Sequence, residues 1–318
     1  MSIGTLRYIG RRLLLTVPTL LIVAALVFTL VRLVPGDPAQ VMLGDAATPE
    51  ALAALRAEMG LDAPLWTQFV TWLGHVVTGD LGTSIITGEA VGGLILERFA
   101  VTASIVVSAV VIATLVAVGL GLTAAAHHRR GSDSAIVAFA TLAMSIPSFW
   151  LGLMLILIFG VKLGWLPVVG YVPLSEGLAG VPYLVMPVLT LAIAESGALI
   201  RMMRASAIDV LGLDYVTHAR AKGQSEPRVL LFHVLPNAFA PTMTLVGLTL
   251  GHLLGGAAVV ETVFTLPGLG RLMVDSVLSR DYPVVQGCLL FTAAVYVLVN
   301  LTTDLLYPLL DPRVRLEA

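Results

Sequence analysis

Side chains capable of phosphate or metal chemistry are scattered through this 318-residue sequence and form no catalytic constellation. Neither Lys162 nor Lys222 completes the Gly-x-x-x-x-Gly-Lys-Ser/Thr pattern whose backbone cradles nucleotide phosphates. His127-His128 are adjacent and would face different directions on a helix, so they favour an ordinary charged turn over a metal pair. We therefore expect no catalytic residue, no metal and no bound cofactor in this chain, and no enzyme activity of its own.

Two ionisable residues, Glu195 and His252, stand inside long apolar runs. An ionised group surrounded by hydrocarbon is costly unless it faces protein or water, so a role in a solute pathway is the functional interpretation. Glu195 would then bind a cationic amine or hydrogen-bond a second subunit. The alternatives are that Glu195 is solvated near Arg201 and that His252 is a packed, hydrogen-bonded histidine.

Four further residues in apolar runs have two interpretations each. Trp150 and Met154 would either line a pore or fill the packing between helices. Pro147 and Pro187 each remove a helix hydrogen bond, and they would mark hinges or simply be tolerated for packing.

A polar island occupies residues 214–237, between two long apolar runs, and lies within a predicted loop at residues 206–237. Its residues 219–222 are good helix formers, and Gly223 can take the left-handed conformation that ends a helix. Pro227 can open a second short helix. The pattern predicts helix, glycine turn, helix, which is either a knob that docks on a partner or a linker held to lipid by its basic residues.

The amino-acid composition indicates whether this chain is surrounded by water or by lipid. Hydrophobic residues make up 58% of it and charged residues 12%, about half the roughly 25% that soluble domains carry. Too few charges remain to cover a water-facing surface, and they are excluded from long blocks, so the chain is an all-α polytopic membrane protein. The formal net charge of −2 gives no sign of nucleic acid binding, and the single cysteine excludes an intrachain disulfide.

Six candidate spans are long enough to cross about 30 Å of hydrocarbon as helices. They are 13–31, 100–126, 134–161, 181–205, 238–260 and 283–308. The first could be a secretory signal peptide because Arg11-Arg12 precede it. Its apolar core is too long for one and Val31–Pro35 offers no cleavage site, so we favour an uncleaved anchor.

Basic residues set the orientation, because they cross membranes poorly. With the N-terminus inside, 12 of the 18 lysines and arginines lie on the cytoplasmic side. These are Arg7, Arg11, Arg12, Arg129, Arg130, Arg201, Arg204, Arg220, Lys222, Arg228, Arg313 and Arg315. Residues 1–12, 206–237 and 309–318 are therefore predicted to be cytoplasmic.

The segment 32–99 would be external and helical. Thr48 can cap a helix that starts at Pro49 and ends at Gly60, and a second helix would open at Pro64. The second helix would lie on the membrane surface with Trp66 and Trp72 at headgroup level, or it would belong to a small packed cap.

The polar island resembles the cytoplasmic loop by which permeases of ABC importers contact their ATPases. That loop reads Glu-Ala-Ala, three residues, Gly, nine residues, a hydrophobic residue, one residue and Leu-Pro. Gly223 and Leu235-Pro236 have this spacing, whereas Thr217-His218-Ala219 replace Glu-Ala-Ala and His233 takes the hydrophobic position. Asp214–Gly223 is similar to the version found in the peptide and nickel subfamily.

Further segments resemble the first permease subunit of that subfamily, in order and nearly end to end. They are Val34–Pro38, Gly79–Ser84, Ser145–Trp150, Arg201–Ser206, Glu261–Gly270 and Asp304–Arg313.

The resemblance implies a type I ABC importer permease fold of six transmembrane helices in the bacterial inner membrane. It implies a second, homologous permease, two ATP-binding subunits that hold ATP and Mg²⁺, an external solute-binding protein and surrounding lipid. It also implies that the ATPases dock on a coupling loop, and that solute crosses by alternating access, most simply a di- or oligopeptide. The docking residues would be Thr217, His218, Ala219, Arg220, Ala221, Lys222, Gly223, Leu235 and Pro236. After Pro267 the chain would break on the outer side and form a re-entrant or surface helix at Arg271–Ser279.

The alternative from another class is an ion-gradient-driven secondary transporter or channel. Such proteins place several ionisable groups at the membrane midplane, and here only Glu195 and His252 are available.

Overall fold

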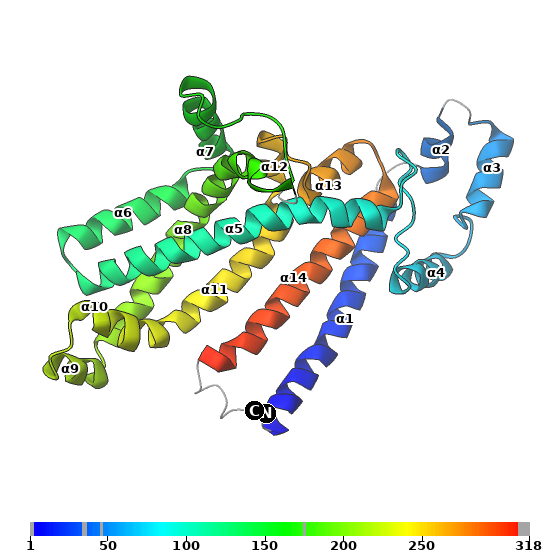
Figure 1. The fold of residues 1–318 in the computed structure, drawn as a ribbon. Helices are drawn as coiled ribbons and strands as arrows, with labels where there is room; N and C mark the ends of the chain where they lie inside the picture. The colour runs from blue at the N-terminus through cyan, green and yellow to red at the C-terminus, as the bar shows by residue number, and fades with distance from the viewer. Residues whose placement is uncertain (1–2, 34–36, 45–46, 174–175, 311–318) are drawn as a thin grey trace.

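The computed structural model describes residues 3–33, 37–44, 47–173 and 176–310, and within them the chain is helical with no β-strand. Five long helices form a bundle (Figure 1). They are α1 (Ile3–Leu33), α5 (Val91–Ala126), α8 (Val181–Leu211), α11 (Leu235–Gly256) and α14 (Tyr282–Leu310). The shorter helices are α2 (Pro38–Leu43), α3 (Pro49–Glu58), α4 (Leu65–Val77), α6 (Gly131–Ser145), α7 (Ser148–Leu155), α9 (Asp214–Ala221), α10 (Glu226–Val229), α12 (Ala258–Val263) and α13 (Leu269–Leu278).

Five helices of the described chain are long and apolar enough to span a membrane, and a sixth span exists if α6 and the helix after it are counted together. The predicted single span 134–161 is instead broken, with a bend of 98° between its halves. Ile146 is extended, with φ −85° and ψ 122°, because the Pro147 ring disfavours helical geometry in the residue before it. A π-helix, Ile156–Lys162, continues α7.

The other predicted spans fall inside longer helices or end earlier than expected. The spans 100–126 and 181–205 lie within α5 and α8, which are longer, and 13–31 lies within α1. The span 238–260 is divided, because α11 ends at Gly256 and α12 follows. Pro187 is buried inside α8, which continues through it, so a helix break accompanies Pro147 and not Pro187.

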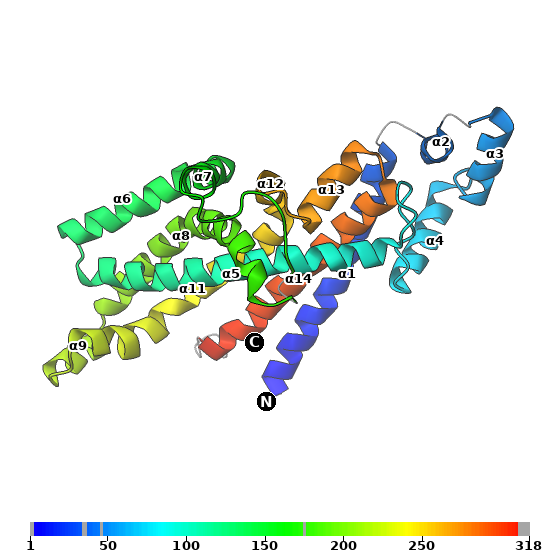
Figure 2. The ribbon, with the colours of Figure 1, turned by 45° about the horizontal axis from the view of Figure 1, so that its top comes forward.

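The core of the bundle lies between α5, α8 and α11. Ile105 and Ala113 of α5 and Leu199 and Ile200 of α8 have no exposed surface. The two helices approach closely at Gly121, where a Cβ would lie 2.7 Å from Cβ of Met203. On the other side α11 packs on α14, and α14 packs on α1, as Figure 2 shows.

The predicted external segment forms helices α2 to α4 at the far end of α1 (Figure 2). The predicted caps are confirmed: the Thr48 side chain accepts a hydrogen bond from Ala51 N–H at 3.2 Å, and Gly60 ends the turn with φ +65°. The contacts of α4 support the packed cap, and its place at the membrane surface stays a prediction. Trp72 packs 5.6 Å from Phe28 of α1, ring centre to ring centre, whereas Trp66 is 72% exposed.

A buried carboxylate fixes α13 at the same end of the bundle. Glu261 of α12 has no exposed surface and accepts hydrogen bonds from the Thr102 hydroxyl of α5 (2.5 Å) and the Arg271 backbone N–H (2.9 Å). The Thr102 oxygen in turn accepts from Leu269 N–H at 2.8 Å. Backbone donors in the first turn of α13 are thereby satisfied, and α5, α12 and α13 form one unit. The short helix predicted at Arg271–Ser279 is present as α13.

We predict that Gly121→Leu destabilises the protein by about 1–3 kcal/mol, because the added side chain overlaps Met203 in a packed core. Gly119→Leu on the same helix is the matched control, since nothing lies within 4 Å of its Cβ position. Thermal unfolding of the purified protein in detergent measures both. Equal midpoints for the two variants would contradict the close α5–α8 approach.

Candidate docking elbow and pathway residues

The polar island folds into an elbow, which we define as residues 214–229, comprising α9, the Gly223 turn and α10. Gly223 has φ +78°, and no atom lies within 4 Å of its Cβ position, so backbone conformation and not space requires glycine there. Gln224 N–H bonds to the Ala219 carbonyl (3.3 Å), and Gly223 N–H bonds to the Arg220 carbonyl (2.9 Å). These two bonds form a Schellman C-cap. Pro227 sits in the first turn of α10, so the predicted helix, glycine turn, helix is confirmed.

The inner face of the elbow is apolar and joins it to three long helices. Val216 and Val229 have no exposed surface, and Ala219 is 6% exposed. They belong to one cluster with Met203, Ala207 and Val210 of α8, Leu122 and Ala125 of α5, and Ala238 of α11. Each fully buried valine contributes about 1.5–3 kcal/mol, so the elbow is held firmly to the ends of these helices.

An ion pair bridges the two arms of the elbow. The Arg220 guanidinium donates to both carboxylate oxygens of Glu226, at 2.5 and 3.1 Å. The hydrogen bond to Glu226 raises the pKa of Arg220. The sequence predicts that Arg220 contacts acidic groups of a partner or lipid. In the structure it pairs with Glu226, six residues away in the same chain. With 41% and 45% of the two side chains exposed, the pair adds only about 0.2–1 kcal/mol.

The predicted docking residues divide by exposure. Ala219 packs inward and Leu235 is half-buried at the start of α11, whereas the others face solvent. The exposed ones are Thr217, His218, Arg220, Ala221, Lys222, Gly223 and Pro236. The structure adds Tyr215 (38% exposed) and Phe232 (69% exposed) at the same end. Tyr215 belongs to the segment Asp214–Gly223 that carries the family resemblance, whereas no sequence pattern singled out Phe232.

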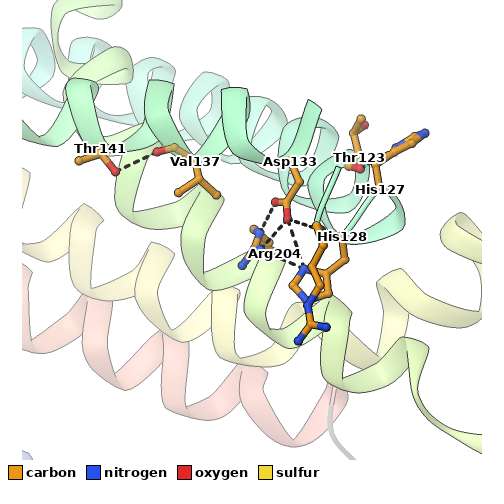
Figure 3. A network of polar contacts seen from close by, with 8 residues as sticks. Thr123, His127, His128, Asp133, Val137, Thr141 and Arg204 are labelled. Carbon is orange, nitrogen blue, oxygen red and sulfur yellow. Dashed lines mark hydrogen bonds and ion pairs between the residues drawn. The ribbon is translucent and has the colours of Figure 1, made fainter. Parts of the chain in front are cut away.

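A buried ion pair beside the elbow fixes the turn between α5 and α6 to α8 (Figure 3). Asp133, 4% exposed, accepts two hydrogen bonds from Arg204 of α8, at 2.6 and 2.8 Å. It also accepts from the Arg129 backbone N–H at 2.9 Å, and Nδ1 of His128 lies 3.2 Å from Asp133 and 3.1 Å from the Arg204 guanidinium. The adjacent His127 interacts electrostatically with Glu226, so this turn lies beside the elbow. Asp133 was not predicted from the sequence.

The two isolated ionisable residues lie on neighbouring helices. Glu195 on α8 is half-buried, His252 on α11 is exposed, and the two interact electrostatically. Trp150, 47% exposed, and the half-buried Met154 lie apart from them in sequence on α7, beyond the Pro147 break. Within the described residues, no group of three or more His, Cys, Asp or Glu could hold a metal ion.

The fold and the elbow together define a membrane-embedded transport subunit. A family model for the binding-protein-dependent transport system inner membrane component matches residues 117–316, and the model for the N-terminal part of such components matches residues 5–106. The chain belongs to this family and is an ABC importer permease of the inner membrane; the predicted family and type I fold are confirmed.

Curated relatives match the chain along nearly its whole length. The glutathione transport system permease protein GsiC of Salmonella typhimurium is 43% identical, covering 98% of this chain and 99% of the relative. A putative peptide transport system permease protein of Brucella abortus is 41% identical (96% and 98%), and a probable peptide ABC transporter permease of Sinorhizobium fredii is 40% identical (97% and 99%). A solved amino acid ABC transporter with histidines is 18% identical, with a TM-score of 0.46, over 70% of this chain and 94% of that chain.

We predict that Arg204→Gln costs about 3–5 kcal/mol, because it leaves the buried Asp133 without its cation. Arg201→Gln, an exposed arginine on the same helix, is the control and should change stability by no more than about 0.5 kcal/mol. The double variant Asp133→Asn, Arg204→Gln should recover part of the loss. Thermal unfolding of the assembled transporter is the measurement, and a loss no greater than that of the control would show that the pair does not hold α6 to α8.

Proposed function

We propose that this permease moves di- or oligopeptides, glutathione among them, across the membrane by alternating access. The elbow carries the proposal, because it presents an exposed polar face while its apolar face is continuous with the ends of α5, α8 and α11. The substrate class is supported by the relatives, which are named as glutathione or peptide permeases.

The working machine would contain more chains than this one. It would comprise a second, homologous permease, two ATPases that hold ATP and Mg²⁺, and an external solute-binding protein. The elbow, the N-terminus and the C-terminus would be cytoplasmic. The start of α1 and the end of α14 lie on the elbow side of the bundle, which supports this orientation (Figures 1 and 2).

The proposed mechanism is mechanical. ATP binding closes the two ATPases on each other. Their closure displaces the elbow, which is the part of this chain that they would bind. Since Val216 and Val229 are packed on α8 and its neighbours, the displacement tilts these helices as a group. Solute then meets an opening on one side of the membrane at a time, and no bond is made or broken in this chain.

Two substitutions test docking. Lys222→Glu reverses an exposed charge at the tip of the elbow and should reduce co-purification of the ATPases severalfold while leaving the fold intact. Lys162→Glu is the matched control, because this lysine is also exposed but lies outside the elbow, at the end of the π-helix that follows α7. Gly223→Ala should reduce ATP-driven uptake, because a Cβ at positive φ costs about 1–2 kcal/mol, whereas Gly212→Ala, at φ −79°, should not. Wild-type co-purification and uptake in Lys222→Glu and Gly223→Ala would refute the docking role.

The pathway residues require a separate experiment. Glu195→Gln should reduce uptake of a peptide with a free amino terminus more than uptake of its N-acetylated form, because the carboxylate would bind the ammonium group. Glu97→Gln, an exposed glutamate on α5, is the control. Reconstituted complexes with ATP inside the vesicles provide the readout. If both peptides are affected equally, or neither is, Glu195 does not bind the amine.

A further inference from the structure

A cavity of about 790 Å³ lies at the end of α1 opposite the elbow. The end of α1, the end of α3, helix α4 and the beginning of α14 line it. Its wall is mixed: Val31, Leu65 and Trp72 are apolar, and Thr67 and Thr71 are polar. Its size is within the range of about 300–1,000 Å³ that is typical of pockets for small ligands. Two arginines, Arg32 and Arg56, line the cavity. The difference between their charged partners indicates the charge of the ligand.

Arg32 is held in place but not neutralised. Its guanidinium donates to Oε1 of Gln68 at 2.8 and 3.1 Å and lies 3.6 Å from the ring centre of Phe28. Gln68 itself is fixed, because its amide nitrogen donates to two backbone carbonyls at 2.8 and 2.9 Å. No acid in the described part of the chain forms an ion pair with Arg32.

Arg56 has the opposite environment. It contacts Asp37 at 3.1 Å and Asp62 at 3.4 Å, so two carboxylates face its single positive charge. The other ionisable lining residue, His75, faces Asp80 at 3.1 Å. Arg32 is therefore the arginine of the cavity lining that has no carboxylate within ion-pair distance among the described residues, and an anionic ligand would supply that partner.

Two more polar groups on the cavity wall are unsatisfied. Tyr282, only 7% exposed, has a buried hydroxyl with no hydrogen-bond partner among the described residues. The amide nitrogen of Gln286, one helical turn later, is also buried without one. Both residues line the cavity. Buried polar groups are rarely left unpaired, so each of these donors would gain a partner if its side chain turned toward an acceptor-rich ligand in the cavity.

The surroundings identify an amphipathic ligand. Arg32 lies at the last turn of an apolar span, Leu14–Leu33, so the cavity is at the level where hydrocarbon ends. Leu30 and Leu33 on α1, and Leu65 and Trp66 on α4, are between 55% and 72% exposed beside it. Tryptophan at this level is typical of the lipid headgroup region. An anion bound here would have apolar chains running alongside α1.

We propose that this cavity binds the phosphate group of a phospholipid in the outer leaflet, with Arg32 as its cationic ligand. Tyr282 and Gln286 donate to phosphate or ester oxygens, and Phe28, Gln68 and Trp72 position the site. A bound lipid would join α4 to α1 and α14, and so hold the external helices against the bundle. The leaflet rests on the orientation proposed above, whereas the site itself does not.

Native mass spectrometry of the complete transporter tests the site without reference to transport. The complex is reconstituted in vesicles of phosphatidylglycerol or phosphatidylethanolamine, extracted in mild detergent, and compared with Arg32→Gln and Tyr282→Phe. Arg271→Gln is the matched control, because this arginine is outside the cavity and already pairs with Asp275 at 3.6 Å. Wild type and control should retain one phospholipid per copy about tenfold more strongly than Arg32→Gln. Tyr282→Phe, which preserves shape, should weaken retention less but measurably.

Three outcomes would overturn the proposal. The first is equal lipid retention by all four proteins. The second is that soluble glycerophosphate stabilises the delipidated complex as well as phospholipid does, which would make the site one for a free phosphate. The third is that Arg32→Gln keeps its lipid but loses affinity for the solute-binding protein, which would make the cavity part of a protein interface. Failure of the docking tests on Lys222 would leave lipid retention unaffected, so the two proposals fail independently.

Discussion

The apolar contact between the elbow and the ends of α5, α8 and α11 is the interaction on which the rest depends. Val216, Ala219 and Val229 are buried against Met203 and Ala207 of α8. Without this contact, residues 214–229 would be a solvated linker. A force applied to them would bend the linker and would not reach the long helices. With the contact, the exposed polar face of the elbow is attached directly to the helices that make the core of the bundle.

Buried polar pairs reinforce the frame where the chain changes direction. Asp133 with Arg204 holds the α5–α6 turn at the elbow end, and Glu261 with Thr102 holds α13 at the other end. Asp281 accepts hydrogen bonds from the Ser84 hydroxyl and the Ile85 N–H, which attaches the loop before α5 to the start of α14. Each pair joins elements far apart in sequence, and in each the carboxylate is buried. Such pairs restrict the bundle to a few packed arrangements, which would suit the proposed alternating access.

Local chemistry made several parts of this structure predictable. The Thr48 cap, the Gly60 stop and the Gly223 turn depend on a residue's own backbone preferences, and each is present. Most of the spans follow from hydrophobicity, and the family follows from ordered short motifs. The bend at Pro147 was predictable as a kink, but its 98° angle was not, because packing of α7 on α8 and α12 sets the direction.

Pairings across the fold were not predictable from one sequence. Nothing in the sequence associates Asp133 with Arg204, or Glu261 with the first turn of α13, since these contacts exist only after the helices pack. Arg220 was assigned to a partner because its own acid, Glu226, lies across a turn that only the backbone geometry closes. No sequence pattern singles out Arg32 either. Its lack of an acidic partner emerges only when its contacts are compared with those of Arg56, which has two.

Spin-label distances in the assembled transporter test most directly whether the elbow moves with the bundle. Labels at exposed Thr217 on α9 and Arg201 on α8 report the contact itself, and labels at Thr217 and exposed Leu14 on α1 report the motion relative to the outer helix. The account predicts that on ATP binding the first distance stays constant while the second changes. A change confined to the first distance, with α8 and α1 fixed relative to each other, would show that the elbow bends independently and would contradict the account.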